Sequence, residues 1–394
     1  MSNNILYLTN YIISDNIGHI EKGFAGANQR SLFENPNAIA HAESPQSHCE
    51  PVADERQGSQ MQSALHVVKP SYPQNWPAYN NAQANEKELF QSLLVELLKG
   101  IGEPSQTMGR PRIPFEDMIF SVAFKVFSTV SGRRFMSDLR DAHAKGHISK
   151  LPCYNSIFNY LESETLTPYL KMLVEESSIP LQTIERDFAV DSSGFSTGVY
   201  KKWADAKWGN VRIRYGQKQP NDINRQDWVK AHVMVGVKTN VITAIEVTHA
   251  HASDHNQFQS LVETTSQNFV IDSVAGDKAY SSYRNLQLIL SKAAMPYIDF
   301  KVTARADGKS PAAWRRMFHY YSYNKEEFMR HYHKRSNVET AFHMIKSKFG
   351  DKVRSRIPTA QMNEVLCKAL CHNISCLIQS MFELNVQPNF WSED

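Results

Sequence analysis

The pattern of apolar and polar residues divides the chain into parts with different periodicities. Residues 1–84 are rich in Asn, Gln, Ser, Ala and Pro and have little periodicity, which predicts a mostly disordered extension. Residues 85–182 repeat apolar positions at helical spacing, and residues 185–382 alternate short apolar runs with helical segments. We therefore predict the extension, a smaller all-helical domain, an α/β domain and a C-terminal tail at 383–394.

The all-helical domain is predicted to consist of short amphipathic helices joined by turns. Its helices are expected at 89–98, 115–130, 135–144 and 157–161. A short turn at 151–156 leads into the last of these, an order compatible with helix-turn-helix DNA binding and equally with an ordinary helical bundle. DNA binding is the role we expect of this domain, and the plain bundle remains the alternative.

The second half of the chain has the element order of a ribonuclease H-like domain, in which helices flank a mixed sheet. Strands are predicted at 188–191, 232–237, 241–248, 269–276 and 296–302, and helices at 254–266, 283–293, around Glu339, and at 358–381. In such a fold the ends of the first and fourth strands lie side by side at the middle of the sheet. Asp191 and Asp277 occupy those ends, and a following helix can bring Glu339 to them.

The segment from Tyr332 to Lys346 has two distinct stripes when it is placed on a helix. Tyr332, Arg335, Glu339 and Lys346 lie at offsets that keep all four within roughly 60° of one another. The apolar residues of the segment gather on a neighbouring face that can pack against a core. A carboxylate flanked by two cations and a phenol suits a metal ion together with a phosphate. The alternative is a solvated face with an Arg–Glu pair four residues apart.

Charge is distributed unevenly along a chain whose formal net charge is only +3. One cationic cluster runs from Lys346 to Arg356 and includes Lys348 and Arg354. A second runs from Lys201 to Lys230, where tryptophans and a tyrosine are interleaved with the cations. Aromatic residues among cations suit base stacking and phosphate contact, and equally a solvated loop with structural tryptophans.

The five cysteines are sparse and odd in number, which favours a reducing compartment over a disulfide scaffold. Cys367, Cys371, His372 and Cys376 lie close together, but apolar residues surround them at helical spacing, so we expect a buried helix rather than a zinc site. No apolar run is long enough to span a bilayer, and the first residues lack the cationic region of a secretory signal. We expect no membrane association and a cytoplasmic location.

Three converging carboxylates would repel one another unless a cation were shared among them. Oxygen ligands favour hard divalent ions, so Mg²⁺, with Mn²⁺ as a substitute, fits better than Zn²⁺. Two such ions can activate an attacking hydroxyl and stabilise a leaving oxygen during phosphoryl transfer. The nucleophile would be water or a DNA 3′-hydroxyl, and Arg335 and Lys346 would hold flanking phosphates.

Three motifs resemble those of the insertion-sequence transposases of bacteria and archaea that carry a DDE domain. They are Asp191-Ser-Ser-Gly194, Gly276-Asp277-Lys278-Ala279-Tyr280 and Tyr332-x2-Arg335-x3-Glu339-x6-Lys346, the last at the full spacing of the Tyr-Arg-Glu-Lys signature. The resemblance covers roughly residues 85–380.

The resemblance implies an enzyme that binds terminal inverted repeats, cuts the element ends and joins them to target DNA. It implies Asp191, Asp277 and Glu339 as catalytic metal ligands for two Mg²⁺ ions, with Tyr332, Arg335 and Lys346 assisting at the DNA. Lys348 and Arg354 are further expected DNA contacts. Joining two ends implies a homo-oligomer of at least two copies, located at the nucleoid of a prokaryote.

One feature departs from some members of that family. They carry a large β-rich insertion between the last strand and the catalytic helix, whereas only about three dozen residues separate Val302 from Glu339 here. We therefore expect no such insertion, and the resemblance gives no support for a DNA-hairpin route that depends on it. Two other functions stay open, a non-catalytic DNA-binding protein derived from such an element and a cellular nuclease of the same fold.

Several other residues have both a functional and a structural interpretation. Lys278 and Tyr280 follow the second aspartate and either contact DNA or serve the fold. The histidines His249, His251 and His255 lie near Asp254, where the start of a helix, with Asp254 as its cap, is preferred to a metal site. The tryptophans Trp203, Trp208 and Trp228 are candidates for stacking on a base.

Overall fold

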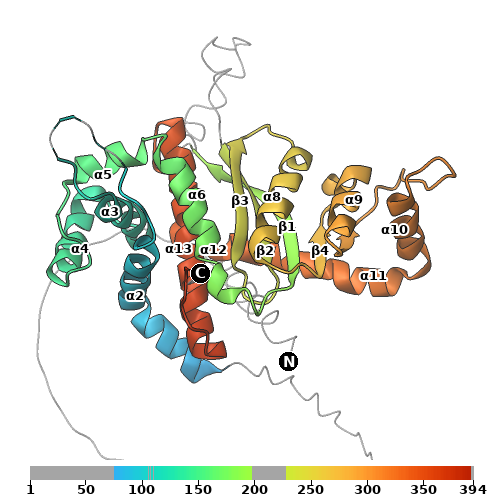
Figure 1. Cartoon of the computed structure of the whole chain (residues 1–394), viewed down its shortest axis with the longest axis horizontal. Coiled ribbons are helices and arrows are strands. Elements are labelled where there is room, and N and C mark those ends of the chain that lie inside the picture. The colour runs from blue at the N-terminus through green and yellow to red at the C-terminus, as the bar shows by residue number, and fades with distance from the viewer. Residues whose placement is uncertain (1–74, 105, 107, 110, 198–227, 392–394) are drawn as a thin grey trace, which may run out of the picture. The chain divides into compact units, whose positions relative to one another are not determined.

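The computed structural model describes residues 75–104, 106, 108–109, 111–197 and 228–391 (Figure 1). The predicted extension therefore lies almost wholly outside the described residues, as does most of the cationic segment 201–230, including Trp203 and Trp208. The described residues belong to one compact unit.

The amino-terminal part is all-helical, as predicted. Its helices are α2 (Trp76–Leu98), α3 (Phe115–Ser128), α4 (Gly132–Ala144), α5 (Tyr154–Leu161) and α6 (Leu166–Glu176), followed by the short η1 (Ile179–Leu181). Helix α2 begins well before the predicted position, because the Asn75 side chain caps it by accepting a hydrogen bond from the Ala78 N–H. Its first turns are polar, so their pattern alone did not indicate a helix.

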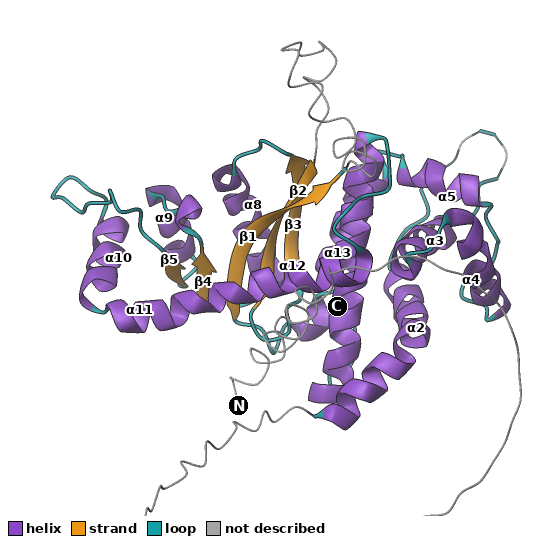
Figure 2. Ribbon diagram, turned by 180° about the vertical axis from the view of Figure 1, so that it is seen from behind, coloured by secondary structure: helices purple, strands orange, loops and turns teal. Residues whose placement is uncertain are grey.

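The carboxy-terminal part contains a five-stranded mixed sheet with the order β3-β2-β1-β4-β5 (Figure 2). The strands are β1 (Asp187–Ser196), β2 (Trp228–Gly236), β3 (Ile242–His249), β4 (Ser273–Gly276) and β5 (Met295–Ile298). Strands β1, β2 and β3 form an antiparallel meander, and β4 and β5 run parallel to β1. This is the ribonuclease H-like arrangement that the element order predicted.

The predicted hairpin between β2 and β3 is confirmed, and a buried carboxylate holds its turn. Glu185 accepts hydrogen bonds from the backbone N–H groups of Lys238 and Thr239 and from the Thr239 hydroxyl. A Cβ atom on Gly236 would lie only 2.5 Å from the Glu185 carboxyl carbon, so the close approach requires glycine there. Asn240 completes the turn with a positive φ of 60°.

Helices cover both faces of the sheet. Apolar residues of α8 (Asp254–Asn268) and α9 (Tyr283–Ser291) pack with Phe188 and Val190 of β1 on one face. On the other face α12 (Ser336–Phe349) and α13 (Pro358–Leu384) pack with Ala189 and Phe195 of the same strand. Side chains alternate between the faces of a strand, so neighbouring residues of β1 serve different cores.

Helix α13 joins the sheet to the amino-terminal helices, which share one apolar core with it. Cys367, Cys371 and Cys376 are buried in this core as free thiols, as expected, and burial lowers the pKa of His372 to about 4. The His372 Nε2 atom lies 2.8 Å from the Asn240 carbonyl oxygen, which is a structural role. The pattern of apolar residues predicted no segment long enough to span a bilayer, but by length and composition α13 is long enough. Its most apolar stretch is 78% buried inside the protein, which is typical of a core helix.

The connection between β5 and α12 contains two helices that the sequence pattern did not reveal. Helices α10 (Ala312–Tyr323) and α11 (Lys325–Tyr332) lie in a segment predicted only as polar and cationic. Their buried residues Trp314, Met317 and Phe328 pack with the aromatic core beside β5. Residues 299–335 are all described and contain no strand, which confirms that no β-rich insertion is present here.

The side chain of Asn373 on α13 joins this helix to β3 and to the end of α6. This fully buried side chain accepts a hydrogen bond from the Ile242 N–H and donates to the carbonyls of Ile242 and Val174 and to the Ser177 hydroxyl. Asn373→Ala leaves these buried groups without partners and is expected to lower the free energy of unfolding by about 2–4 kcal/mol. Chemical denaturation measures this, and Gln379→Ala, at a half-buried position of the same helix, should change it by less than about 1 kcal/mol.

Candidate active site

Asp191 and Asp277 lie on neighbouring strands at equivalent positions. The parallel pairing of β1 with β4 ends at Val190 opposite Gly276, and each aspartate is the next residue of its own strand path. The predicted juxtaposition of these two carboxylates is therefore present in the fold. The sequence pattern predicted that the first strand ends at Asp191, which is wrong. Strand β1 continues to Ser196, because its antiparallel pairing with β2 extends that far.

Glu339 is in the first turn of α12, which crosses the same region of the sheet (Figure 2). The predicted single helix from Tyr332 to Lys346 is interrupted: α11 ends at Tyr332, and the 3₁₀ turn η4 (His333–Arg335) joins it to α12. Near this turn the Ser336 hydroxyl donates to the His333 carbonyl, and the Asn337 side chain donates to the Lys334 carbonyl. Such local side-chain bonds compete with regular helical hydrogen bonds.

Arg335 joins two of the three predicted catalytic carboxylates. Its Nη1 atom lies 2.9 Å from Asp191 Oδ2, and its Nη2 atom lies 2.6 Å from Glu339 Oε1. Burial raises the pKa of Asp191, and the charges of Asp277 and Glu339 add to the rise, while the Ser192 N–H and Arg335 oppose it. The Asp191 carboxyl is therefore affected by the charges of both other acidic residues, although the three come from separate segments.

Tyr332 lies at the same site. Burial raises the pKa of its phenol, and the charges of Asp299 and Asp277 raise it further, while Arg335 lowers it. The Tyr332 phenol is therefore close enough to Arg335, Asp299 and Asp277 for their charges to affect its pKa.

Lys346 extends the site along β1. Its ammonium group donates to the Ser193 hydroxyl at 2.6 Å and lies 5.3 Å from the centre of the Phe195 ring. Ser193 is two residues beyond Asp191, so both side chains are on the α12 face of the strand. Burial lowers the pKa of Lys346, which indicates a partly desolvated cation. Ser193 was not predicted as a site residue, although the alternation along the strand would have indicated it.

Lys348 and Arg354 make contacts within the protein. Lys348 forms an ion pair with Glu86 of α2 and donates to the Ser375 hydroxyl at 2.9 Å. The Arg354 guanidinium donates to the Thr129 carbonyl at the end of α3. Both cations thereby connect the amino-terminal helices to the segment around α12, and their DNA contacts stay a prediction.

On the opposite face of β1 the structure reveals a polar group that the sequence did not. Asp254 is not the cap of α8, because its carboxylate pairs with Lys230 at 2.6 Å and with His232 Nδ1 at 3.1 Å. His232 pairs with Ser192 across the β1–β2 ladder. Tyr280 is fully buried beside α8 and so serves the fold.

Trp228 lies at the start of β2 and donates from its indole N–H to the Ala250 carbonyl. Among the described residues the histidines near Asp254 do not assemble a metal site.

The carboxylate oxygens of the site are the ligands that a hard divalent cation prefers, although the side chains are not arranged to coordinate one together. Among the described residues no group of three or more His, Cys, Asp or Glu side chains is placed to hold a metal. The cause is Arg335, whose guanidinium lies between Asp191 and Glu339. The Glu339 side chain is 56% exposed, so it can leave Arg335 for a new rotamer at little cost. Asp191, Asp277 and Glu339 are the residues that would hold an ion.

Comparison with known families agrees with this geometry. Residues 182–374, from the turn before β1 into α13, match the family model described as a transposase DDE domain. The chain therefore carries the domain that is typical of the DDE transposases. It is an enzyme of that class, and DDE transposases use divalent metal ions. The matched residues include all three acidic positions.

Two other comparisons add little to this assignment. Among solved structures, the DDE transposase is similar to a piggyBac transposase synaptic complex with hairpin DNA, with 12% identity, a TM-score of 0.36, and coverage of 80% of this chain and 77% of that chain. At this identity and TM-score the similarity does not bear on the residues of the site. No curated protein sequence matches the chain.

A divalent ion shared by the carboxylates predicts a stability change that needs no activity. Mg²⁺ or Mn²⁺ should raise the melting temperature of the transposase, by an amount equivalent to about 2.7 kcal/mol at 100 times the Kd. Asp191→Asn and Asp277→Asn should lose most of this increase. Without the ion Asp277→Asn should melt higher than the natural protein, because one repelling charge is removed.

Differential scanning fluorimetry with and without the ion measures both effects. Asp272→Asn is the matched control, since that carboxylate is exposed and pairs with Arg186. An ion-dependent increase that is equal in all four proteins would show that the three carboxylates do not share the ion.

Proposed function

We propose that the transposase binds the terminal inverted repeats of an insertion sequence, cuts the element ends and joins the 3′-hydroxyl to target DNA. In this proposal Asp191, Asp277 and Glu339 are the metal ligands. The observation that carries it is the meeting of three distant acidic segments: two aspartates at adjacent strand positions, and a glutamate tied to the first through Arg335. Their proximity supports phosphoryl transfer because like charges converge only where a cation compensates them.

The ions bound by these carboxylates supply activation of the attacking hydroxyl and stabilisation of the leaving oxygen. Arg335 neutralises the carboxylates in the resting protein and is positioned to move to a DNA phosphate when they bind ions. Its planar guanidinium suits two parallel hydrogen bonds to phosphate oxygens. Lys346, held against Ser193, contributes a second cation on the same face, and Tyr332 contributes a phenol whose pKa is affected by the charges of Arg335 and Asp277.

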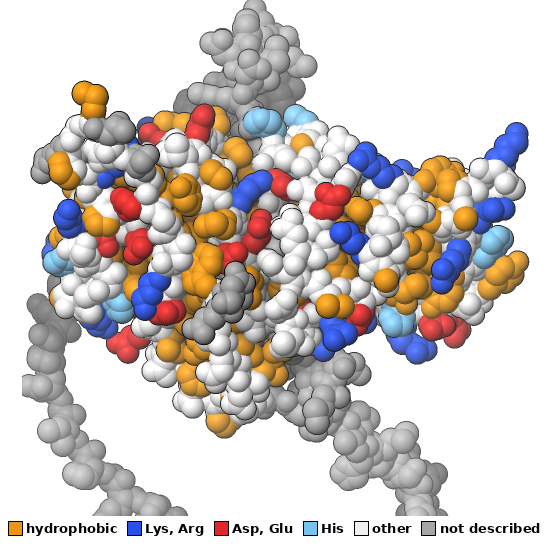
Figure 3. Space-filling model, viewed as in Figure 1, with side chains coloured by type: hydrophobic (Ala, Val, Ile, Leu, Met, Phe, Trp, Pro, Cys, Tyr) orange, Lys and Arg blue, Asp and Glu red, His pale blue; other side chains and the backbone are white. Residues whose placement is uncertain are grey.

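Cations on α10, on α11 and on the loop that precedes α10 supply a further surface for DNA (Figure 3). The segment 300–335 contains nine Lys and Arg residues and only three acidic ones. Seven of the nine form no ion pair with a carboxylate among the described residues, namely Lys301, Arg305, Lys309, Arg315, Arg316, Lys325 and Arg330. Unpaired cations beside the site fit the phosphate backbone of a duplex.

Joining two element ends at one target requires two sites, so we propose a homo-oligomer of at least two copies on DNA. The absence of a β-rich insertion between β5 and α12, a fully described segment, gives no support for a second-strand route that depends on one. The ion is proposed to be Mg²⁺, with Mn²⁺ able to replace it.

Removal of any one acidic side chain tests the proposed catalytic role. Asp191→Ala, Asp277→Ala and Glu339→Ala are each expected to abolish cleavage and joining of DNA carrying the element ends, while DNA binding remains. The reason is the loss of an ion ligand from a site that contacts DNA chiefly through cations. A gel assay with Mg²⁺ measures cleavage and joining, and a mobility shift measures binding.

Asp272→Asn serves as the control and should keep full activity. Mg²⁺-dependent joining by any of the three alanine variants would falsify the assignment. Cleavage without joining, and without a need for inverted repeats, would instead identify a nuclease. Binding without cleavage by the natural protein would identify a non-catalytic DNA-binding protein.

The salt dependence of DNA binding tests the two cations. Arg335→Ala and Lys346→Ala should each reduce the slope of log K against log salt by about 1, because each removes one phosphate contact. Fluorescence anisotropy with the cleaved end over a range of NaCl concentrations measures this slope. Lys99→Ala, at an exposed position paired with Glu96 on α2, should leave the slope unchanged. Equal slopes for all variants would remove Arg335 and Lys346 from the DNA interface.

A further inference from the structure

A cavity of about 520 Å³ lies between the amino-terminal helices and the segment that joins α12 to α13. Its walls come from α3, α5, α13, the turn at 129–132 and residues 354–356. The volume falls within the usual range for a small-molecule site. None of the predicted catalytic residues lines it.

The charged residues of this cavity are unequal in number. Four cations line it, Lys125, Arg354, Arg356 and Lys368, against two anions, Glu162 and Glu364. Lys125 is half-buried and Lys368 is buried, whereas Arg354 and Arg356 are exposed. A cation that is removed from water is ordinarily paired, so Lys125 and Lys368 each need a polar partner.

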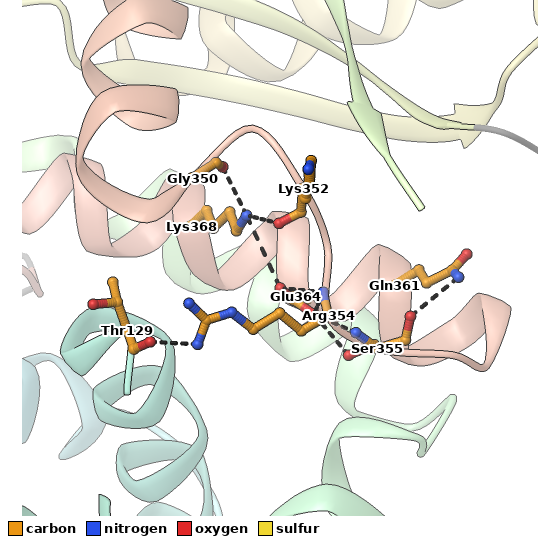
Figure 4. Close-up of polar contacts among 8 residues, drawn as sticks. All are labelled: Thr129, Gly350, Lys352, Arg354, Ser355, Gln361, Glu364 and Lys368. Carbon is orange, nitrogen blue, oxygen red and sulfur yellow. Dashed lines mark hydrogen bonds and ion pairs between the residues drawn. The ribbon is translucent and has the colours of Figure 1, made fainter. Parts of the chain in front are cut away.

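Glu364 and Lys368 are committed to the fold, and the Arg354 guanidinium donates one hydrogen bond to the Thr129 carbonyl, as Figure 4 shows. Glu364 accepts hydrogen bonds from the backbone N–H groups of Arg354 and Ser355 and from the Ser355 hydroxyl. Lys368 donates to the carbonyls of Gly350 and Lys352 at 2.9 and 2.7 Å. These bonds hold the joining segment against α13. The Glu364 carboxylate is thereby engaged by two backbone N–H groups and the Ser355 hydroxyl, and the Lys368 ammonium group lies 3.9 Å from it.

Lys125 is the cation without a counterpart. Among the described residues its ammonium group has no hydrogen bond and no ion pair. Burial lowers the pKa of Lys125, and the charge of Arg354 lowers it further, with Glu364 acting in the opposite direction. A desolvated ammonium group that faces a guanidinium is a favourable position for an oxyanion.

The remaining walls of the cavity are apolar, and one of them is an accessible aromatic ring. Phe158 of α5 is 38% exposed and lies against Gly132, where a Cβ atom would approach its ring to 2.7 Å. Ile157 and Val126 extend this apolar wall. A cavity that contains both cations and an accessible aromatic ring matches a nucleotide, whose phosphate is anionic and whose base stacks.

We infer that this cavity binds a nucleotide unit, with its phosphate at Lys125 and Arg354 and its base against Phe158. The nucleotide is either part of a DNA strand or a free nucleotide. The DNA source rests on the proposed function, whereas the free nucleotide does not.

The cavity is connected to the catalytic strand and helix. Phe349, the last residue of α12, lines it. Ser196 at the end of β1 exchanges backbone hydrogen bonds with Asp351 and Val353 of the joining segment. Occupation of the cavity therefore acts on the elements that hold Asp191 and Glu339.

Binding to the full-length protein without divalent ions tests the inference. The probes are inorganic phosphate, dAMP and a ten-nucleotide single strand of thymidines, each followed by titration calorimetry or anisotropy. Lys125→Met should weaken binding of a nucleotide probe about ten-fold or more, since a charge-assisted hydrogen bond is lost. Lys99→Met is the matched control and should bind as the natural protein does.

Two further readouts separate binding from folding. Without a probe Lys125→Met should melt at a higher temperature, because an unpaired desolvated charge is removed. Phe158→Ala, at a partly exposed position, should weaken binding of dAMP or the oligonucleotide but leave inorganic phosphate unchanged.

If Lys125→Met binds dAMP more weakly than the natural protein does, the cavity is a free-nucleotide site. If only binding of the oligonucleotide is weakened, the cavity is a DNA-strand site. Equal binding of both nucleotide probes by the natural protein and Lys125→Met overturns the inference, as does binding of neither or of inorganic phosphate alone. Asp191→Asn should retain the cavity binding, so failure of the proposed catalytic role leaves this result unaffected.

Discussion

The interaction on which the site depends is the double ion pair of Arg335. Its guanidinium holds Asp191 of β1 and Glu339 of α12 together, with Asp277 next to Asp191 on the adjacent strand. Without a cation, charges from three segments would push the strand ends and α12 apart. Arg335 supplies that cation from the protein itself, and a hard divalent ion would supply more charge at the same place. The arginine and the ion are therefore alternatives for one electrostatic requirement.

The fold provides this arrangement through shared cores rather than through a self-contained catalytic module. Alternate residues of β1 serve the two faces of the sheet, so Asp191 and Ser193 point toward α12 while Val190 and Ser192 face α8. Helix α13 then fixes α12 and the meander to the amino-terminal helices. Lys348 and Arg354 reinforce this connection through Glu86 and Thr129. The position of the catalytic helix thus depends on residues far from the carboxylates.

The sequence predicted the parts of the molecule whose signals are local or strongly periodic. The hairpin at Lys238–Asn240, the long apolar helix α13 and the two aspartates at the ends of buried runs all follow from patterns of a few residues. The order of the elements then identified the sheet topology. Helices α10 and α11 were missed, because their aromatic residues bury one face only through contacts with α9, with β5 and with Phe300. The interruption of the helix at His333–Arg335 was missed, because the local hydrogen bonds from the Ser336 and Asn337 side chains do not change the spacing of apolar residues along the sequence.

Other features depend on contacts that no single sequence displays. Asp254 has the sequence position of a helix cap, and only the fold shows that its carboxylate pairs with Lys230 and His232 instead. Lys125 is one polar residue in an apolar helix, and only the cavity shows that its charge lacks a partner. Lys348 and Arg354 belong to a cationic cluster in sequence, and their partners are more than 200 residues away. The topology of the fold decides which charged residues pair over long distances in the sequence. The local pattern of apolar and polar residues carries no information on this pairing.

The most direct test of the account is the position of a bound Mn²⁺ ion, found by anomalous diffraction from crystals of the full-length protein. The account predicts Mn²⁺ at about 2.0–2.3 Å from carboxylate oxygens of Asp191, Asp277 and Glu339, with Arg335 no longer in contact with Glu339. Mn²⁺ bound elsewhere, with Arg335 still joining Asp191 to Glu339, would contradict it.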